Sequence, residues 1–171
     1  MEQATVVVGV DGSGHSREAV RYALADAARR GAALVAVRAF PPPGPPADDR
    51  WAPERQGVVP PSLSEITTNV EGQTRRLVRD LAEEVGGSAT TVPVEALGLV
   101  GPPATVLLDQ AGHADLLVVG RRGRGALAST VLGSVSLRCV LQAHCPVAVV
   151  PLPADRPRAD RPVIDAASAR T

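Results

Sequence analysis

The chain has 171 residues, 44% of them hydrophobic but only 2% aromatic, which predicts one domain with a core of Val, Leu and Ala. Eighteen basic residues balance eighteen acidic ones, so a general attraction to nucleic acid or to an anionic membrane is not expected. Every basic residue is Arg, which excludes a P-loop lysine, a Schiff-base lysine and a lysine general base.

The N-terminal part of the chain alternates between strand and helix patterns. Residues 5–10 form a β-branched run, typical of a strand buried on both faces, and turn residues end it. Ser16 is expected to cap a helix that runs to Arg30, and Gly31 is expected to end that helix. Residues 33–39 are the second expected strand.

The composition changes after the second strand. Residues 41–61 hold eight prolines and the only tryptophan, Trp51, so they are expected to be an insertion without a helix interior or a central strand. A flap that places Trp51 over a ligand is one hypothesis, but a loop without ligand contact is favoured. Residues 62–85 return to helical spacing of apolar side chains.

The rest of the chain continues the alternation. Strands are expected at residues 90–96, 115–119 and 146–150, helices at 104–111 and 134–143, and a turn at 98–103. This pattern predicts an α/β fold over residues 1–152, with one doubly wound five-stranded parallel sheet and helices on both faces. Residues 153–171 lack periodicity and are expected to form a disordered tail.

The most informative segment is glycine-rich and lies between the fourth strand and the last helix. Gly120, Gly123, Gly133 and Ser134 follow the pattern G-x2-G-x9-G-S. Gly120 and Gly123 can adopt positive φ and, because they have no Cβ, let a phosphate approach the backbone. Free N–H groups after Gly133, together with the helix dipole, favour an anion. The segment therefore predicts a phosphate site that needs no lysine.

Asp11-Gly12-Ser13 after the first strand, this glycine motif and the closing segment GSVSLRCVLQAHCPVAVVP together resemble the universal stress protein family over residues 5–151. The resemblance implies sheet order 3-2-1-4-5, a homodimer through the C-terminal strand, and a bound nucleotide, which is ATP or another adenine nucleotide, with Mg²⁺. It places Asp11 at the ribose and adenine, and the backbone of Ala39 at the adenine edge. The expected nucleotide-binding residues are Asp11, Gly12, Ser13, Ala39, Val119, Gly120, Arg121, Gly123, Gly133, Ser134, Val135 and Ser136.

The predicted function is that of an ATP-binding stress-response regulator, which acts by nucleotide-dependent conformational or partner switching. No catalytic residue is expected, and at most slow ATP hydrolysis. Two alternatives stay open: an ATP hydrolase or transferase on a related α/β scaffold, and a nucleotide-free dimeric interaction module. Phosphate release would distinguish the first alternative, and the absence of copurified nucleotide the second.

Other kinds of site are disfavoured. The first turn, GVDGSG, departs from the dinucleotide fingerprint, and no acid ends the second strand. The histidines are scattered and the cysteines lack zinc spacing, so no protein metal site is expected. GRRGRG lacks the stacking aromatics of a nucleic-acid site. Without a run of about 18 apolar residues or a signal peptide, the chain is expected in the cytoplasm and not in a membrane.

Overall fold

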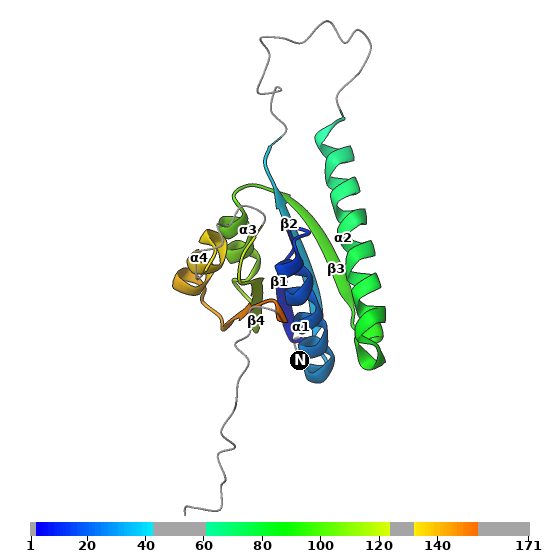
Figure 1. Cartoon of the computed structure of the whole chain (residues 1–171). Coiled ribbons are helices and arrows are strands. Elements are labelled where there is room, and N and C mark those ends of the chain that lie inside the picture. Colours follow the sequence, from blue (N-terminus) through cyan, green and yellow to red (C-terminus); the bar gives the residue numbers. More distant parts are fainter. Residues whose placement is uncertain (1–2, 43–60, 124–131, 154–171) are drawn as a thin grey trace, which may run out of the picture.

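A computed structural model describes residues 3–42, 61–123 and 132–153, in which strands and helices alternate along the chain (Figure 1). The elements are β1 (Thr5–Gly9), α1 (Gly14–Arg30), β2 (Ala33–Phe40), α2 (Leu63–Val85), the 3-10 helix η1 (Gly87–Thr91), β3 (Val94–Val100), α3 (Pro103–Gln110), β4 (Leu116–Gly120), α4 (Ser134–Gln142) and β5 (Val147–Val150).

The five strands form one sheet of order β3-β2-β1-β4-β5, and every neighbouring pair is parallel. This arrangement confirms the predicted fold. Val7 of β1 is paired with Val35 of β2 on one side and with Leu117 of β4 on the other, so β1 is the central strand. The direction of winding reverses between β1 and β4, and the carboxyl ends of these two strands therefore border a crevice.

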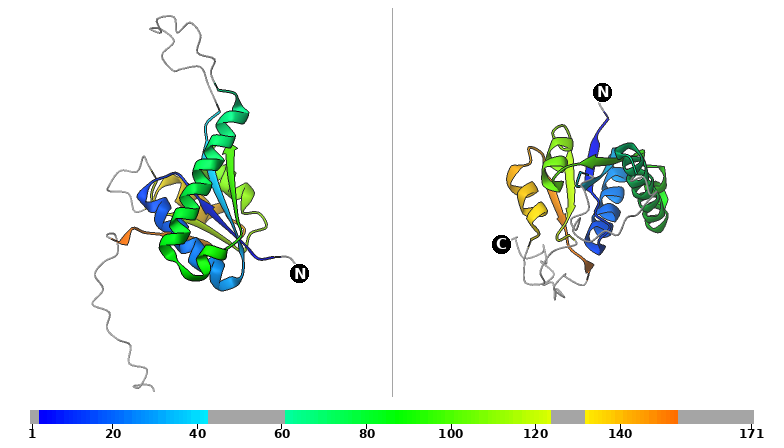
Figure 2. Two further views of the ribbon diagram at one scale, coloured as in Figure 1. Left: turned by 90° about the vertical axis from the view of Figure 1, so that its right-hand side faces the viewer. Right: turned by 90° about the horizontal axis from the view of Figure 1, so that it is seen from above.

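Helices cover both faces of the sheet (Figure 2). Val6 and Val8 pack with α1 and α2 on one face, while Val7 packs with α3 and α4 on the other. All three valines are at most 1% exposed. Burial on both faces explains why β1 is an unbroken apolar run and does not alternate between apolar and polar residues.

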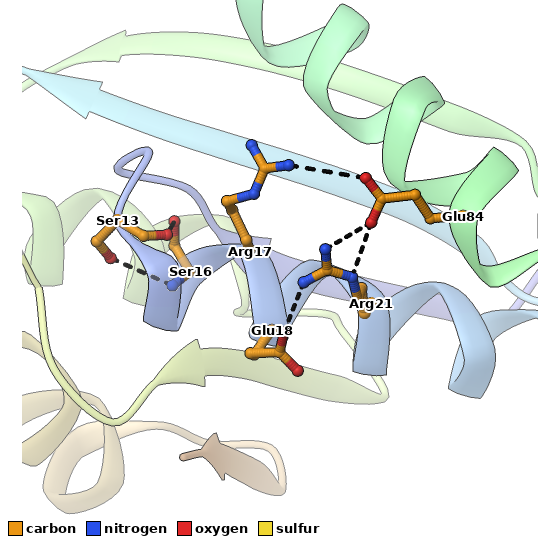
Figure 3. A network of polar contacts seen from close by, with 6 residues as sticks. All are labelled: Ser13, Ser16, Arg17, Glu18, Arg21 and Glu84. Carbon is orange, nitrogen blue, oxygen red and sulfur yellow. Dashed lines mark hydrogen bonds and ion pairs between the residues drawn. The ribbon is translucent and has the colours of Figure 1, made fainter. Parts of the chain in front are cut away.

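The start of α1 differs from the sequence expectation, because Ser13 and not Ser16 caps the helix. The Ser13 Oγ accepts a hydrogen bond of 3.2 Å from the Ser16 backbone N–H (Figure 3). Ser16 is buried in the first turn, where its hydroxyl accepts from the Gly12 N–H and donates to the Ser13 carbonyl, both at 3.1 Å. The helix ends, as predicted, at Gly31 in the left-handed region with φ 65°.

The third strand also differs from the expectation. Residues 87–91 form η1, and β3 extends through Gly98 to Val100, where a turn was expected. Gly98 lies within the strand because α2 crosses it closely: a Cβ there would lie 3.1 Å from Val70 Cγ1. Glu71 of α2 also accepts a hydrogen bond of 3.4 Å from the Gly98 N–H, so α2 covers this edge of the sheet.

Polar contacts form at both ends of α2. Near its C-terminus, Glu84 pairs with Arg21 of α1 at 2.5 Å and with Arg17 at 3.8 Å (Figure 3), and the hydrogen bond to Glu84 raises the pKa of Arg21. At its N-terminus, Ser62 and Glu65 form a reciprocal capping box. The hydrogen bonds from Ser62 lower the pKa of the Glu65 carboxyl.

Parts of the chain lie outside the described residues. They include residues 43–60, with Trp51, and residues 154–171. The proline-rich insertion, the flap hypothesis and the disordered tail therefore stay predictions.

The packing of Gly120 gives a testable prediction for stability. A Cβ at Gly120 would lie 2.8 Å from the backbone carbonyl of His15, so Gly120→Ala should lower the free energy of unfolding by about 1–3 kcal/mol. Gly72→Ala in α2 is the matched control: its nearest atom is 3.8 Å away, and it should raise stability by about 0.5–1 kcal/mol. Urea unfolding measures both, and a Gly120→Ala variant as stable as the wild type would contradict the packing argument.

Candidate functional site

A cavity of about 510 Å³ opens at the carboxyl edge of the sheet, where β1, β2 and β4 end. This volume lies within the range of small-molecule and cofactor sites. Most of the residues expected from the sequence line it, although they come from distant parts of the chain. Those residues are Asp11, Ala39, Val119, Gly120, Gly123, Gly133, Ser134, Val135 and Ser136.

Three expected residues, Gly12, Ser13 and Arg121, are not among those that line the cavity, but each supports its wall. Gly12 has φ 81°, the left-handed conformation that the turn after β1 requires. Ser13 caps α1. The Arg121 carbonyl accepts a hydrogen bond of 2.9 Å from the Gly133 N–H, which joins the two ends of the glycine segment.

The cavity has an apolar end and a polar end. β2 and α3 contribute Val37, Ala39, Pro103 and Leu107. The polar end is formed by the turn after β1, the first turn of α1, the glycine segment and the start of α4. Its polar side chains belong to Asp11, Ser16, Arg122, Ser134 and Ser136.

Sequence reasoning missed most of the apolar end. Val37 precedes Ala39 by two residues and so shares its face of the strand, a period that could have identified it. Pro103 opens α3 directly after β3, at the same edge of the sheet, and the predicted topology could have placed it there. The remaining missed residues are Gly9, Val10, Ser16, Leu107 and Leu132.

Asp11 is held at the rim of the cavity by its own turn. Its Oδ1 accepts a hydrogen bond of 2.8 Å from the Ser13 N–H. Its Oδ2 lies next to Gly123, where an added Cβ would be only 2.9 Å from it. Gly123 thus leaves room for the carboxylate, and two segments more than a hundred residues apart meet at this point.

The freedom of glycine to adopt a positive φ is not used at Gly120 or Gly123, because neither residue has a positive φ. Their lack of a side chain serves close packing instead. Gly120 admits the backbone of His15, and a Cβ on Gly133, whose φ is −71°, would lie 3.3 Å from Arg122 Cα. The absence of side chains at these positions lets chain segments approach one another closely.

The first turn of α4 presents backbone donors to the cavity. The first hydrogen bond within the helix runs from the Leu137 N–H to the Gly133 carbonyl, so the N–H groups of Ser134, Val135 and Ser136 precede the helical ladder. Gly133, at the N-cap, has no side chain to cover them. The positive end of the helix dipole adds to these donors, and the turn can hold an anion.

The Ser136 hydroxyl has a structural partner. Ser136 is 3% exposed, and its Oγ donates a hydrogen bond of 2.6 Å to the Gly120 carbonyl. This bond ties α4 to the end of β4. Ser136 therefore contributes its backbone to the anion-binding turn, while its side chain fixes the position of that turn.

The described residues give little support for metal binding, cysteine reactivity or a membrane span. They contain no group of three or more His, Cys, Asp or Glu side chains that could hold a metal ion. Cys139 is buried and Cys145 half-buried, and burial raises the pKa of both thiols, which makes them weak nucleophiles. Among residues 3–42, 61–123 and 132–153, the helices are too short or too polar to cross a bilayer.

Comparison with solved structures supports the fold. A universal stress protein solved in complex with cAMP superposes with a TM-score of 0.57, at 25% identity over 88% of this chain and 98% of that one. The universal stress protein of Archaeoglobus fulgidus in complex with dAMP gives a TM-score of 0.56, at 21% identity over 88% and 99% of the two chains.

Sequence comparison identifies the family. A universal stress protein of Thermus aquaticus is 40% identical over 152 residues, 85% of this chain and 97% of its own. Universal stress proteins of Mycobacterium tuberculosis and Mycobacterium bovis are 35% identical over 162 residues, and the chain spans about half the length of these relatives. The model of the universal stress protein family matches residues 4–151, and the chain belongs to that family.

Proposed function

We propose that this chain binds an adenine nucleotide in the cavity at the carboxyl edge of the sheet and acts as a nucleotide-responsive regulator. One observation carries the proposal: a single cavity joins an apolar end, the Asp11 carboxylate and the uncapped start of α4. These three features suit a base, a ribose and a phosphate group in turn. The cAMP and dAMP complexes of the two structural neighbours support the same ligand class.

The proposed binding mode assigns each part of the nucleotide to a wall. The base lies between the apolar residues of β2 and α3, with its edge at the Ala39 backbone. Asp11 accepts hydrogen bonds from ribose hydroxyls. The phosphates lie at Gly123, Gly133 and the first turn of α4, where Arg122 adds positive charge.

ATP with Mg²⁺ is the proposed form of the ligand. The described residues offer no cluster of metal-ligating side chains, so the phosphates themselves would supply most ligands of the ion. The ion would neutralise phosphate charge that the backbone donors of α4 leave uncompensated.

Binding without efficient turnover fits the lining of the cavity. Asp11 is the one carboxylate among its described lining residues, and neither His nor Cys lines it. A general base must lie within hydrogen-bond reach of the proton that it removes, whereas the binding mode assigns Asp11 to the ribose and away from the reacting phosphate. Nucleotide binding would instead order the glycine segment and change the surface that a partner meets.

The homodimer is proposed to form through β5. β5 is the edge strand opposite β3, and no further strand is paired with it among the described residues. Next to it, α4 exposes three apolar side chains: Leu137 at 46%, Val140 at 46% and Leu141 at 73%. An open strand edge beside an apolar helix face favours pairing with a second copy.

Native mass spectrometry of freshly purified protein tests the proposed ligand and subunit number together. We expect a dimer that carries the mass of an adenine nucleotide on each subunit. The purified protein should release phosphate from ATP no faster than a background control. Protein that purifies empty and fails to bind added ATP, AMP or cAMP would favour the nucleotide-free module, and rapid steady-state phosphate release would favour the enzyme.

Glycine substitutions test the phosphate end. Gly123→Val would press against Asp11 and Gly133→Val against the Arg122 backbone, so each should weaken ATP binding at least about tenfold, or about 1.4 kcal/mol. Gly112→Val, at an exposed glycine outside the cavity, is the matched control and should bind normally. Calorimetric titration measures affinity and circular dichroism checks folding. Unchanged affinity in both folded variants would contradict the assignment.

A charge on α4 tests the dimer. Leu141→Asp places a carboxylate on the exposed apolar face and should convert the dimer to a monomer, because desolvating the charge at the interface is unfavourable. Leu63→Asp, at 47% exposure on α2, is the control and should stay dimeric. Light scattering after size-exclusion chromatography gives the mass. A dimeric Leu141→Asp variant would show that this face is not the interface.

A further inference from the structure

A second, smaller cavity of about 310 Å³ adjoins the apolar end of the nucleotide cavity; we name it the apolar annex. Its own walls come from the end of β2 and from the turn between β3 and α3. These walls consist of Phe40, Pro41, Pro42, Gly101 and Pro102.

The annex and the nucleotide cavity are adjacent spaces with a shared boundary. Ala39 and Pro103 line both of them. Ala39 is also the residue whose backbone the proposed binding mode places at the adenine edge. The annex therefore begins where the base ends, on the side away from the phosphates.

The walls of the annex are joined to each other in the structure. Phe40 is paired with Val100 in the sheet register, and its carbonyl accepts a hydrogen bond of 3.0 Å from the Gly101 N–H. Pro102 is the N-cap of α3, which fixes the turn on the other side. Two neighbouring strand ends and one helix start thus hold the annex open.

The chemistry of the annex is uniformly apolar. Phe, Pro, Gly and Ala side chains carry no hydrogen-bonding group, and the ring nitrogens of the prolines have no hydrogen to donate. An engineered cavity of about 150 Å³ suffices to bind benzene in another protein, so the annex has room for a ring. A polar ligand would lose its hydration there without compensation.

We propose that the site accepts adenine nucleotides that carry an apolar substituent on the exocyclic amine of the base, with the substituent in the annex. This inference rests on the proposed nucleotide function and deepens it. The proposal takes the base edge at Ala39 to be the one that carries the exocyclic amine, so that a substituent on the amine extends toward the annex that Ala39 also lines. A substituent there leaves the ribose contact at Asp11 and the phosphate contacts at α4 unchanged.

Titration calorimetry of the full chain with ATP and with N6-benzyl-ATP tests the proposal. The benzyl compound should bind about fivefold more tightly or better, because its ring would bury apolar surface against the apolar walls of the annex. Equal or weaker binding of N6-benzyl-ATP, with ATP still bound, would overturn the annex assignment alone. Failure of both ligands to bind would overturn the nucleotide function and this inference with it.

Two variants test whether the preference for N6-benzyl-ATP over ATP arises from the annex. Phe40→Ala removes the one aromatic wall of the annex without altering a lining residue of the nucleotide cavity, so it should abolish the preference and keep ATP affinity. Val100→Ala changes the paired position of β3, which lies outside the annex. This variant should keep both the preference for N6-benzyl-ATP and the affinity for ATP. A preference that survives in folded Phe40→Ala would overturn the assignment, and the wild-type comparison decides the question if that variant does not fold.

Discussion

The absence of a side chain at Gly120 is the constraint on which the site depends. The backbone of His15, at the start of α1, lies only 2.8 Å from where a Cβ of Gly120 would be, and the Ser136 hydroxyl of α4 donates a hydrogen bond to the Gly120 carbonyl. Two helix N-termini and one strand end therefore meet at a single residue. Since the meeting point is backbone against backbone, it has little freedom to adjust, and it holds the anion-binding turn in a fixed position relative to Asp11.

The sheet order followed from the family resemblance, and the alternation of elements followed from the apolar pattern. Buried runs such as Val6–Val8 and the Gly31 cap carry strong local signals, and the structure confirms them. Ser16 was misassigned because two serines three residues apart compete for the N-cap, and only the turn at Gly12 decides between them. Gly98 resembled a turn residue because the close crossing of α2 is a tertiary effect.

The same distinction between local sequence signals and tertiary packing applies to the candidate site. The residues of its polar half belong to two short sequence motifs, so residues such as Asp11 and Gly133 were identified from spacing and resemblance. Apart from Ala39, its apolar half consists of Val37, Pro103 and Leu107, which resemble ordinary core residues in the sequence. Local sequence identifies groups with distinctive chemistry, whereas the surface that would receive a base becomes evident only when the strands and helices are packed together.

Backbone polar groups at the end of β2 and at the start of α2 have hydrogen-bond partners outside the segment that connects the two elements. The Phe40 carbonyl is satisfied by Gly101, and α2 supplies its own cap through Ser62 and Glu65. The entropic cost of closing a connection grows only with the logarithm of its length. Insertions and deletions between these two elements are therefore nearly neutral for the core, and this connection is a place where members of the family can diversify without losing their architecture.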